Sequence, residues 1–348
     1  MPKVAIIIVN YNGQEYLHDC LSSLLSLDYP QELYKIILVD NASSDNSVEF
    51  VKNNFPQVEI IVNQQNLGFA QGNNVAMAKA LQRDFDYILL INQDTISQPD
   101  FLSKIIKVAE ADEKIAAVQP RLMLHPQTDK VNSLGNAIHY LGFGYSLGAN
   151  QPLSGDLQSF EIAYASGAAL LMKSEVLKQI GLFDPDFFMY HEDLDLGWRM
   201  RMAGYKIMVV PESVVYHKYE FSRSVKKYYY MERNRYICIL ENYKWLSILL
   251  ITPACLVMEL GLFLFSLKSG FWQEKIRGYL YFLKPQSWQK IFQHRQEKKK
   301  YRQVKDKQVI KYFTGKITNQ EIDNWLLDKI ANPIFNLYWQ IIKKLIIW

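Results

Sequence analysis

Long apolar runs and polar stretches succeed each other along the first 95 residues. Residues 4–9 form a continuous apolar run, the pattern of a parallel strand covered on both faces. After the polar stretch 10–13, leucines recur at helical spacing over residues 17–25. A second apolar run, residues 35–39, ends at Asp40. The pattern therefore predicts a βαβ unit at the start of the chain.

The same succession continues beyond Asp40. Ser43 or Ser44 can cap a helix, and residues 58–62 predict a third strand. A helix over residues 70–80 and a fourth strand over residues 87–91 follow. Four strand–helix alternations predict an α/β fold with a doubly wound sheet.

Polar side chains follow each expected strand at its carboxyl end, where ligands bind in such sheets. They are Tyr11, Asn12, Asp40, Asn41, residues 66–69 and residues 92–94. Each can be a helix cap or a turn residue, but together they suit a nucleotide. Tyr11 can stack on a base, Asp40 can accept a hydrogen bond from it, and Asp94 can hold a divalent cation on phosphate.

Composition and missing motifs exclude several classes of protein. Neither GxxxxGK[ST] nor GxGxxG follows the first expected strand, which argues against an ATPase or a Rossmann dehydrogenase. A net charge of +4 on 348 residues is too small to indicate nucleic-acid binding. The three cysteines lack CxxC spacing and fit a reducing cytoplasm. The short apolar run at the start is interpreted as a strand and not as a signal peptide.

The stretch FFMYHEDLDLGWRM, residues 187–200, concentrates acids beside a histidine. Three interpretations are open: acids at the start of a helix, a metal site, or a catalytic centre. A metal chelate of His191, Asp193 and Asp195 would need a strand to bring alternate residues to one face, whereas LGWRMRMAG is helix-like. The helix-start and catalytic interpretations are compatible, because the helix would direct its backbone N–H groups and a catalytic base at the same cleft.

Six blocks in order resemble the family-two inverting glycosyltransferases with the GT-A fold, and most of all their rhamnosyltransferase-like branch. The blocks are VNYNG (9–13), VDNASSDNS (39–47), NLGFAQGNN (66–74), INQDT (91–95), SGAALLM (166–172) and FDPDFFMYHEDLDLGWRMRMAGY (183–205). The resemblance extends over about 200 residues. It implies a doubly wound mixed sheet and the transfer of a sugar from a nucleoside diphosphate.

The resemblance also implies roles for residues of the nucleotide side. The expected nucleotide-binding residues are Tyr11, Asn12, Asp40, Asn66, Gly68 and Asn92. Asp94 matches the last acid of the family's DxD motif, which binds Mg or Mn on the diphosphate, while Asn92 stands where many members have the first Asp. His217 falls where some relatives have a further metal ligand, although a lone histidine after a strand is often structural.

On the acceptor side, the resemblance implies that Asp193 is the general base. Direct displacement needs a carboxylate that takes the proton of the acceptor hydroxyl. Glu192, Trp198 and Arg199 are expected to lie on the acceptor side with it. The family's processive members carry QxxRW after the base, and its absence predicts that one sugar is added per encounter.

The last third of the chain has the features of a membrane-associating region. Residues 245–267 are long enough to span a bilayer, but they contain Glu259 and Pro253, which favour helices lying in the interface. Residues 290–311 carry nine Lys/Arg against two Asp/Glu, and residues 334–348 add Trp, Tyr and Lys. The alternative for these segments is packing against the catalytic part.

Together these observations predict a catalytic domain over residues 1–235, with a nucleotide half to about 115, and a helical, basic region over residues 236–348. The expected enzyme lies at the cytoplasmic face of the membrane and glycosylates a lipid-linked or polysaccharide acceptor. The resemblance to the rhamnosyltransferase-like branch favours dTDP-rhamnose as the donor, followed by UDP-hexoses. The alternatives are a metal-dependent nucleotidyltransferase and a non-catalytic nucleotide-sugar-binding protein.

Overall fold

The computed structural model describes residues 1–348 apart from 154, 156, 220–226, 319–324 and 326. A mixed ten-stranded sheet runs through this part of the chain in the order β10-β12-β6-β11-β4-β1-β2-β3, with β5 beside β12 and β7 beside β6. Its strands are β1 (Val4–Asn10), β2 (Tyr34–Asp40), β3 (Glu59–Val62), β4 (Tyr87–Ile91), β5 (Thr95–Ser97), β6 (Ile115–Leu124), β7 (Val131–Ser133), β10 (Phe160–Glu161), β11 (Ala169–Lys173) and β12 (Lys206–His217).

The four predicted strands are present and form the parallel half of the sheet. β1 pairs in parallel with β2 and β4, and β2 with β3. β11 then lies antiparallel between β4 and β6, which makes the sheet mixed. The boundaries differ by a residue or two from the prediction, because β1 includes Asn10 and β3 starts at Glu59.

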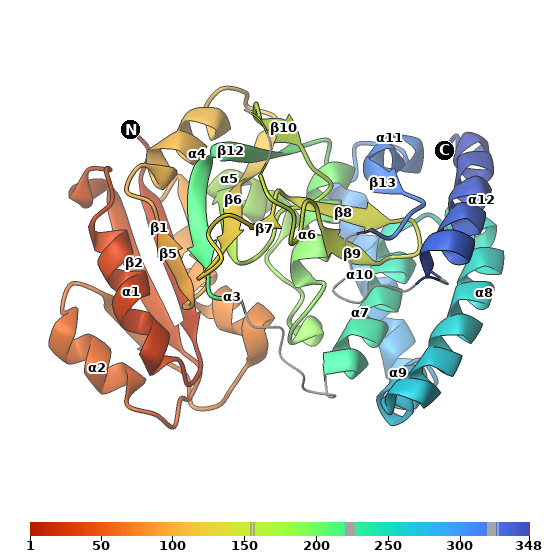
Figure 1. Ribbon diagram of the computed structural model, residues 1–348, viewed down its shortest axis with the longest axis horizontal. Coiled ribbons are helices and arrows are strands. Elements are labelled where there is room, and N and C mark those ends of the chain that lie inside the picture. Colours follow the sequence, from red (N-terminus) through yellow and green to blue (C-terminus); the bar gives the residue numbers. More distant parts are fainter. Residues whose placement is uncertain (154, 156, 220–226, 319–324, 326) are drawn as a thin grey trace.

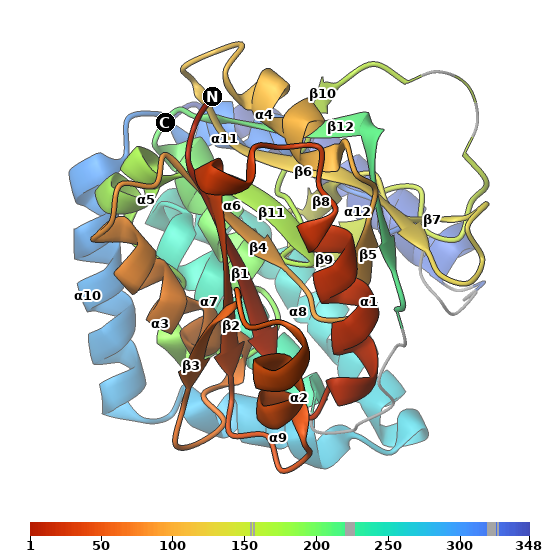
Figure 2. The same ribbon diagram turned by 90° about the vertical axis from the view of Figure 1, so that its left-hand side faces the viewer.

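Helices cover both faces of the sheet. α1 and α3 lie on opposite sides of it in Figure 2. The helices of this part are α1 (Gln14–Leu25), α2 (Ser47–Asn54), α3 (Gly68–Leu81), α4 (Phe101–Ala109), α5 (Ser174–Ile180) and α6 (Glu192–Met202), with 3-10 turns η1 (Gln31–Leu33) and η2 (Pro185–Phe187). Successive residues of β1 enter different cores: Ile6 packs on the α1 side and Ile7 on the α3 side.

The last third of the chain is helical and packs beside α6 (Figure 1). It contains α7 (Lys227–Asn242), α8 (Trp245–Ser269), α9 (Trp272–Tyr281), α10 (Pro285–Tyr301), α11 (Asp306–Val309), η3 (Ile310–Tyr312), a π-helical turn η4 (Leu327–Ala331) and α12 (Asn332–Leu345). A small sheet, β13-β8-β9, joins β13 (Phe313–Thr314) to β8 (Asn136–His139) and β9 (Gly144–Ser146). The predicted division at residue 235 falls inside α7, and residues of both parts share one hydrophobic core.

The structure adds two observations about this region. Pro253, which can break or kink a helix, lies inside α8, and the helix continues through it to Ser269. Two cations of the basic run on α10 are internal: Arg295 donates to the carbonyls of Leu240 and Tyr243, and Lys298 is buried beside Asp195. These two serve packing between helices, whereas Lys290, Lys299 and Lys300 of the same helix are exposed.

Candidate active site

The ends of β1 and β2 are joined by a hydrogen-bonded network around Asp40, which is 1% exposed. Its Oδ1 accepts from Asn10 Nδ2 (2.8 Å) and Ser43 Oγ (2.6 Å), and its Oδ2 accepts from Ser43 N (3.0 Å). Asp40 therefore shapes the loop after β2 as well as lying at the nucleotide rim. A hydrogen bond from a nucleotide base to Asp40 would have to use the carboxylate lone pairs that these three hydrogen bonds do not occupy.

Tyr11 and Asn12 lie on the neighbouring loop after β1. Tyr11 is 48% exposed, so its ring is available for stacking. Asn12 adopts a positive φ of 50°. Its N–H donates to Ser43 Oγ (2.9 Å), and its Oδ1 accepts from Ser44 N (2.7 Å). The structure thus brings the predicted residues of the first two strands onto one rim.

The loop before α3 depends on Gly68. Its φ is +75°, and a Cβ there would lie 2.4 Å from the carbonyl oxygen of Phe188. Asn66 Oδ1 accepts from Gly68 N (2.8 Å), and Asn41 Nδ2 donates to Gly68 O (2.9 Å). The loop is therefore fixed to the nucleotide rim on one side and touches the segment before Asp193 on the other.

Asp94 and His217 meet at the end of β4, although 123 positions separate them in the sequence. β5 follows Asp94 directly and pairs with the end of β12, so that His217 lies opposite Thr95. His217 Nε2 is 3.2 Å from Asp94 Oδ1. A bulge in β12 sets this register: Val210 pairs with Pro120, whereas Val214 pairs with Arg121. Asn92 directly follows β4 beside them, and its carbonyl accepts from Thr95 Oγ1.

The chemistry of this pair fits a divalent cation. His217 Nδ1 is 3.0 Å from Asn132 Oδ1, an acceptor, so this nitrogen carries the proton. In the neutral imidazole, Nε2 then presents a lone pair to a carboxylate oxygen. Two acceptors at 3.2 Å repel each other unless a proton or a metal lies between them, and a second partner on Nδ1 is the usual arrangement of a metal-binding histidine.

Among the described residues, another group, Asp184, Glu241 and His294, has metal-ligand spacing. The negative charges of Asp184 and Glu241 are already balanced by neighbouring cations. Hydrogen bonds to Asp184 and Glu241 raise the pKa of His294 to about 10. Glu241 also accepts from Lys298 at 2.8 Å. A metal would have to displace a proton and compete with an ammonium group, so Asp94 and His217 are the better candidates.

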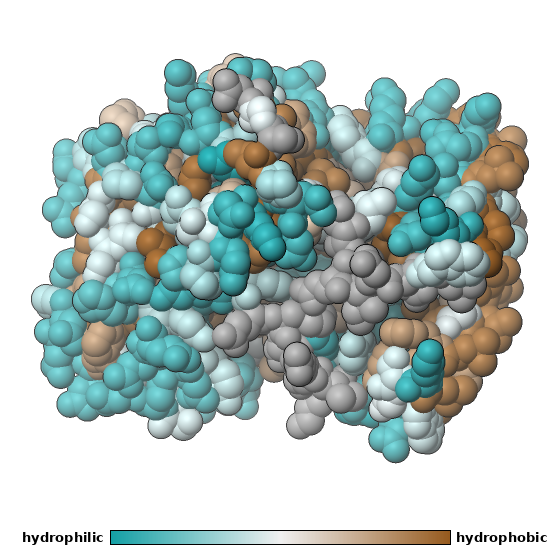
Figure 3. All heavy atoms as spheres, viewed as in Figure 1, coloured by the Kyte–Doolittle hydropathy of each residue, from teal (hydrophilic) through white to brown (hydrophobic). Residues whose placement is uncertain are grey.

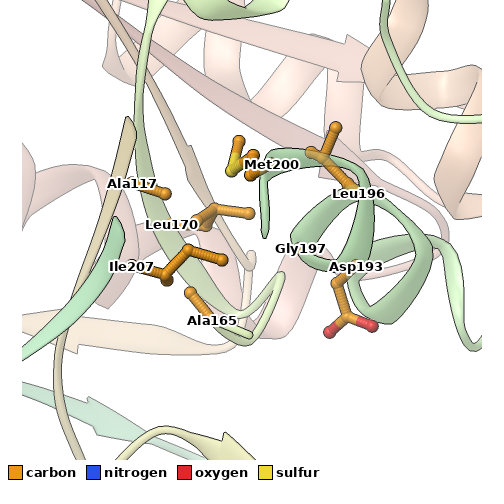
Figure 4. Close-up of a pocket in the computed structure, with 8 residues that line it drawn as sticks. All are labelled: Ala117, Ala165, Leu170, Asp193, Leu196, Gly197, Met200 and Ile207. Carbon is orange, nitrogen blue, oxygen red and sulfur yellow. The ribbon is translucent and has the colours of Figure 1, made fainter. Parts of the chain in front are cut away.

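Asp193 lies in the first turn of α6, at the boundary between the core and the rim. Its Oδ2 accepts from Gly167 N (3.1 Å) and its Oδ1 from Leu194 N (2.8 Å). In Figure 4 its carboxylate points away from the apolar side chains of Leu196 and Met200. Burial raises the pKa of Asp193 to about 6, against the effect of these hydrogen bonds. Such a carboxylate is ionised at neutral pH and still basic enough to accept a proton.

The other acids of this stretch have different surroundings. Burial, and then the charge of Asp193, raise the pKa of Glu192 well above its ordinary value. It is only 6% exposed, which places it beneath the site. Asp195 Oδ2 accepts from Arg199 Nε (2.7 Å), and its Oδ1 accepts from Lys298 Nζ (2.8 Å). His191, Asp193 and Asp195 therefore do not chelate one metal, and α6 begins with its acids as a helix.

Trp198 and Arg199 are not brought to the acceptor side, contrary to the sequence prediction. Trp198 is 1% exposed and packs edge-on against Tyr243 and Phe313. Arg199 pairs with Asp195 and donates to the carbonyls of residues 180–182. Both side chains hold α6 in place from behind.

Three further residues of the site had no role assigned from the sequence, although Gln93 and Gly167 stand in blocks that carry the family resemblance. Asn132, which fixes the His217 tautomer, lies 85 positions away from it. Gln93 Oε1 accepts from Tyr11 N (3.1 Å), and a Cβ on Gly13 would collide with this side chain. Gly167, whose backbone N–H donates to Asp193, lies in the SGAALLM block.

A mixed sheet with polar residues at the carboxyl ends of its parallel strands, and an acidic helix start beside them, is the arrangement of the GT-A class of glycosyltransferases. Residues 2–238 match the family described as "Glycosyltransferase like family 2". The chain belongs to this family, and it is a glycosyltransferase.

Curated relatives include poly-beta-1,6-N-acetyl-D-glucosamine synthases of staphylococci. The protein of Staphylococcus epidermidis is 29% identical over 229 residues, which are 61% of this chain and 51% of that protein. The protein of Staphylococcus aureus is 28% identical over the same length. The chain spans about half the length of these relatives.

Solved structures with the same fold include three transferases. GalNAc-T7 with UDP, GalNAc and Mn²⁺ aligns with a TM-score of 0.56 at 15% identity, over 69% of this chain and 48% of that one. The mannosyltransferase PcManGT from Pyrobaculum calidifontis, in complex with GDP-Man and Mn²⁺, gives 0.52 at 16% identity over 86% of each chain. S. aureus TarS 1–349 with UDP gives 0.51 at 16% identity, over 98% and 90%.

Proposed function

We propose that this glycosyltransferase moves a sugar from a nucleoside diphosphate to a hydroxyl of a lipid-linked or polysaccharide acceptor, with inversion at the anomeric carbon. The observation that carries the proposal is the position of Asp193. It is an ionisable carboxylate at a helix start, and its segment is in contact with the Gly68 loop of the nucleotide rim. Donor and base thus share one site.

The proposed reaction is a single displacement. The acceptor oxygen forms a bond to the anomeric carbon as the bond from that carbon to the diphosphate oxygen breaks. Asp193 accepts the hydroxyl proton, and the nucleoside diphosphate leaves with the bonding electrons. Gly167 N and Leu194 N hold the two carboxylate oxygens during this step. One sugar per encounter remains our prediction.

Asp94 and His217 are the residues proposed to hold a divalent cation, Mg²⁺ or Mn²⁺. When bound, the ion would neutralise negative charge that develops on the leaving diphosphate. Asn132 keeps His217 in the tautomer that presents Nε2. The Mn²⁺ in the names of two structural neighbours supports this proposal.

The proposed donor is a pyrimidine nucleotide sugar. dTDP-rhamnose is suggested by the resemblance to the rhamnosyltransferase-like branch, and a UDP-hexose by the UDP in the names of GalNAc-T7 and TarS. Tyr11 is proposed to stack on the base, and Asp40 to accept from its N–H. The staphylococcal relatives, named as polysaccharide synthases, support a polysaccharide acceptor.

Thermal unfolding with a panel of donors tests this function. With Mn²⁺ or Mg²⁺ present, dTDP-rhamnose or a UDP-hexose should raise the midpoint, because a ligand at 100 times its Kd stabilises the native state by about 2.7 kcal/mol. Asp94→Ala should remove the metal-dependent part of this shift. Asp129→Ala, a change of an exposed acid, is the control. No response to any donor, or an unchanged metal dependence in Asp94→Ala, would contradict the proposal.

We also propose that α8 and α12 lie in the membrane interface. Among the described residues, α8 alone has the length and composition of a membrane span, and only 17% of its most apolar part is buried. Apolar residues gather on the side of the molecule where α8 and α12 lie (Figure 3). They include Leu249, Leu256, Val257, Leu260, Leu264, Ile334, Leu337, Ile341 and Leu345, each more than half exposed.

The contacts of α8 favour an in-plane helix over a span. Its one acid, Glu259, pairs with Arg235 (2.9 Å) and Lys275 (2.5 Å) and accepts from two tyrosine hydroxyls. Nearer its start, Ser247 Oγ donates to Asp306 Oδ2 (2.5 Å). A helix held at both places to the rest of the protein cannot cross a bilayer alone, whereas its free face can enter one leaflet.

Charges on this face should weaken membrane binding. Leu256→Glu with Leu260→Glu is expected to lower binding to lipid vesicles at least ~10-fold, because each side chain loses about 1.5–3 kcal/mol of apolar burial and adds a charge. Flotation with vesicles of phosphatidylcholine and phosphatidylglycerol measures this. Val62→Glu, at a 57% exposed residue on β3, is the matched control. Equal flotation of both variants would contradict the in-plane proposal.

A further inference from the structure

The backbone just before Asp193 bends through conformations that L-residues rarely adopt. Phe188, Tyr190 and His191 have φ values of 61°, 66° and 70°. Three non-glycine residues with positive φ within four positions are unusual, and such a bend persists only where its surroundings hold it. Glu192 and Asp193 follow at once as the first residues of α6.

Two adjacent residues of α7 hold this bend through its carbonyl oxygens. Asn234, which is fully buried, donates from Nδ2 to the carbonyls of Phe187 (2.9 Å), Met189 (3.0 Å) and Tyr190 (2.7 Å). Arg233 donates from Nη2 to the carbonyls of Asp186 and Phe187. Arg233 also donates from Nε to Asn234 Oδ1 (2.9 Å), which orients the amide.

The two remaining carbonyls of the bend are bound from other directions. Phe188 O accepts from Ala70 N (3.1 Å), at the start of α3 next to Gly68. His191 O accepts from Asp195 N (2.8 Å) and lies 3.9 Å from Cys238 Sγ, one turn after Asn234 on α7. Every carbonyl from residue 186 to 191 therefore has a donor, and α7 supplies most of them.

Arg233 is itself held in place. It is 7% exposed, and the rings of Tyr229, Tyr230 and Tyr281 surround its guanidinium at 5.1–5.4 Å. Tyr230 stacks on Phe188, the most unusual residue of the bend, with ring centroids 5.0 Å apart. The helix that leads into the C-terminal region thus presents a rigid surface to the segment that carries the base.

We propose that Arg233 and Asn234 are positioning residues of the sugar transfer: they hold the 186–191 bend in the conformation that directs Asp193 at the acceptor hydroxyl. This inference rests on the proposed role of Asp193 as the base. Neither residue touches the reacting atoms. Their effect is geometric, and a displacement of a catalytic group by about 1 Å can cost ~10²-fold in rate.

Asn234→Ala tests the proposal, with Asn332→Ala as the matched control. Asn332 is also buried and also bonds a backbone, through Ile317 N (2.8 Å) and Ile317 O (2.7 Å), but it lies on α12 away from the bend. Asn234→Ala should lower the transfer rate at saturating donor and acceptor by ~100-fold and leave the donor Kd within about threefold. Asn332→Ala should leave the rate per folded molecule unchanged.

Amide hydrogen exchange of residues 186–195 gives a readout that needs no activity. Asn234→Ala should lose protection there, whereas Asn332→Ala should not. If Asn234→Ala folds poorly, Arg233→Lys is the second variant. It keeps the positive charge but loses the guanidinium N–H groups that bond the carbonyls of the bend. It should give a ~10-fold slower transfer rate with the same local loss of protection.

The outcomes separate the two proposals. A wild-type protein that binds donors but transfers no sugar would overturn the proposed function and with it the catalytic part of this inference, whereas the exchange experiment would still show whether the two residues hold the bend. Unchanged protection in both α7 variants would overturn the positioning role. So would a transfer rate within threefold of wild type, or a parallel loss of donor binding and rate.

Discussion

Asparagine in place of Asp193 is expected to reduce sugar transfer by about 10² to 10⁴-fold while donor binding is retained. The amide has nearly the shape of the carboxylate and can still accept a hydrogen bond from Gly167 N, but it cannot take a proton. Asp193 lies on α6, whereas the nucleotide rim is built from the ends of β1, β2 and β4. Initial rates with saturating donor, beside donor titrations, separate the two effects.

The pH dependence follows from the raised pKa of Asp193, which is about 6 in the folded protein against an ordinary 3.8. Transfer by the wild type should rise with pH through about 6 and then level off as the base becomes ionised. The free energy of unfolding changes with pH in the opposite direction to the transfer rate, because the folded state binds the Asp193 proton more tightly than the unfolded state. The stabilisation that comes from this proton is fully present below pH 3.8 and is lost as pH rises through about 6.

Asp193→Asn should therefore melt at a higher temperature than the wild type at pH 8 and lose this advantage at pH 4. One pKa unit corresponds to about 1.4 kcal/mol, so about 3 kcal/mol is the upper bound. Asp129→Asn, at an exposed acid, should change neither rate nor stability. Transfer within a few-fold of the wild type in Asp193→Asn would show that another group is the base.

The second large effect is expected from Lys298→Met. The Lys298 ammonium donates to Asp195 Oδ1 (2.8 Å), Glu241 Oε2 (2.8 Å) and Asn242 Oδ1 (3.0 Å), so all its protons have acceptors. Although burial opposes its charge, Asp195 and then Glu241 raise the pKa of Lys298. Removal of one partner from a buried ion pair costs about 3–5 kcal/mol, since the remaining carboxylates lose their compensation.

Urea denaturation of Lys298→Met measures this loss. Lys300→Met is the control, because Lys300 lies on the same helix and is exposed. The lysine joins α10 to α6, so the variant should also transfer sugar more slowly per folded molecule. Equal unfolding free energies for the two variants would contradict the buried role of Lys298.

The placement of the rim residues at one edge of the sheet could be predicted because its signals are local, while their contacts with a nucleotide stay a prediction. Tyr11, Asp40 and Asp94 each follow a strand whose apolar run is visible in the sequence, and the carboxyl ends of parallel strands meet at one edge. Gly68 was predicted in the same way, because it lies in the loop that follows the third expected strand. The pairing of Asp94 with His217 was suggested only by resemblance, because it depends on β5 and the bulged β12.

The surroundings of the base were harder to predict, because α6 is buried on nearly all sides and shows no amphipathic pattern. Trp198 and Arg199 therefore gave no indication of which way they point. Their partners, such as Phe313, come from distant parts of the chain. The burial of Lys298 could not be predicted for the same reason: the acids that neutralise it lie on α6 and α7.

The bulge in β12 makes one part of the site depend on chain length more than on residue identity. Three residues, 211–213, stand between the pairs Val210–Pro120 and Val214–Arg121. Side chains alternate between the faces of a strand, so loss or gain of one residue here would turn His217 to the opposite face from Asp94. Of the three residues, Glu212 is exposed, whereas Ser213 is fully buried and donates from Oγ to the carbonyl of Phe101 (2.9 Å). In the evolution of this enzyme, a single-codon deletion at Glu212 would thus be a more severe event than any point mutation there.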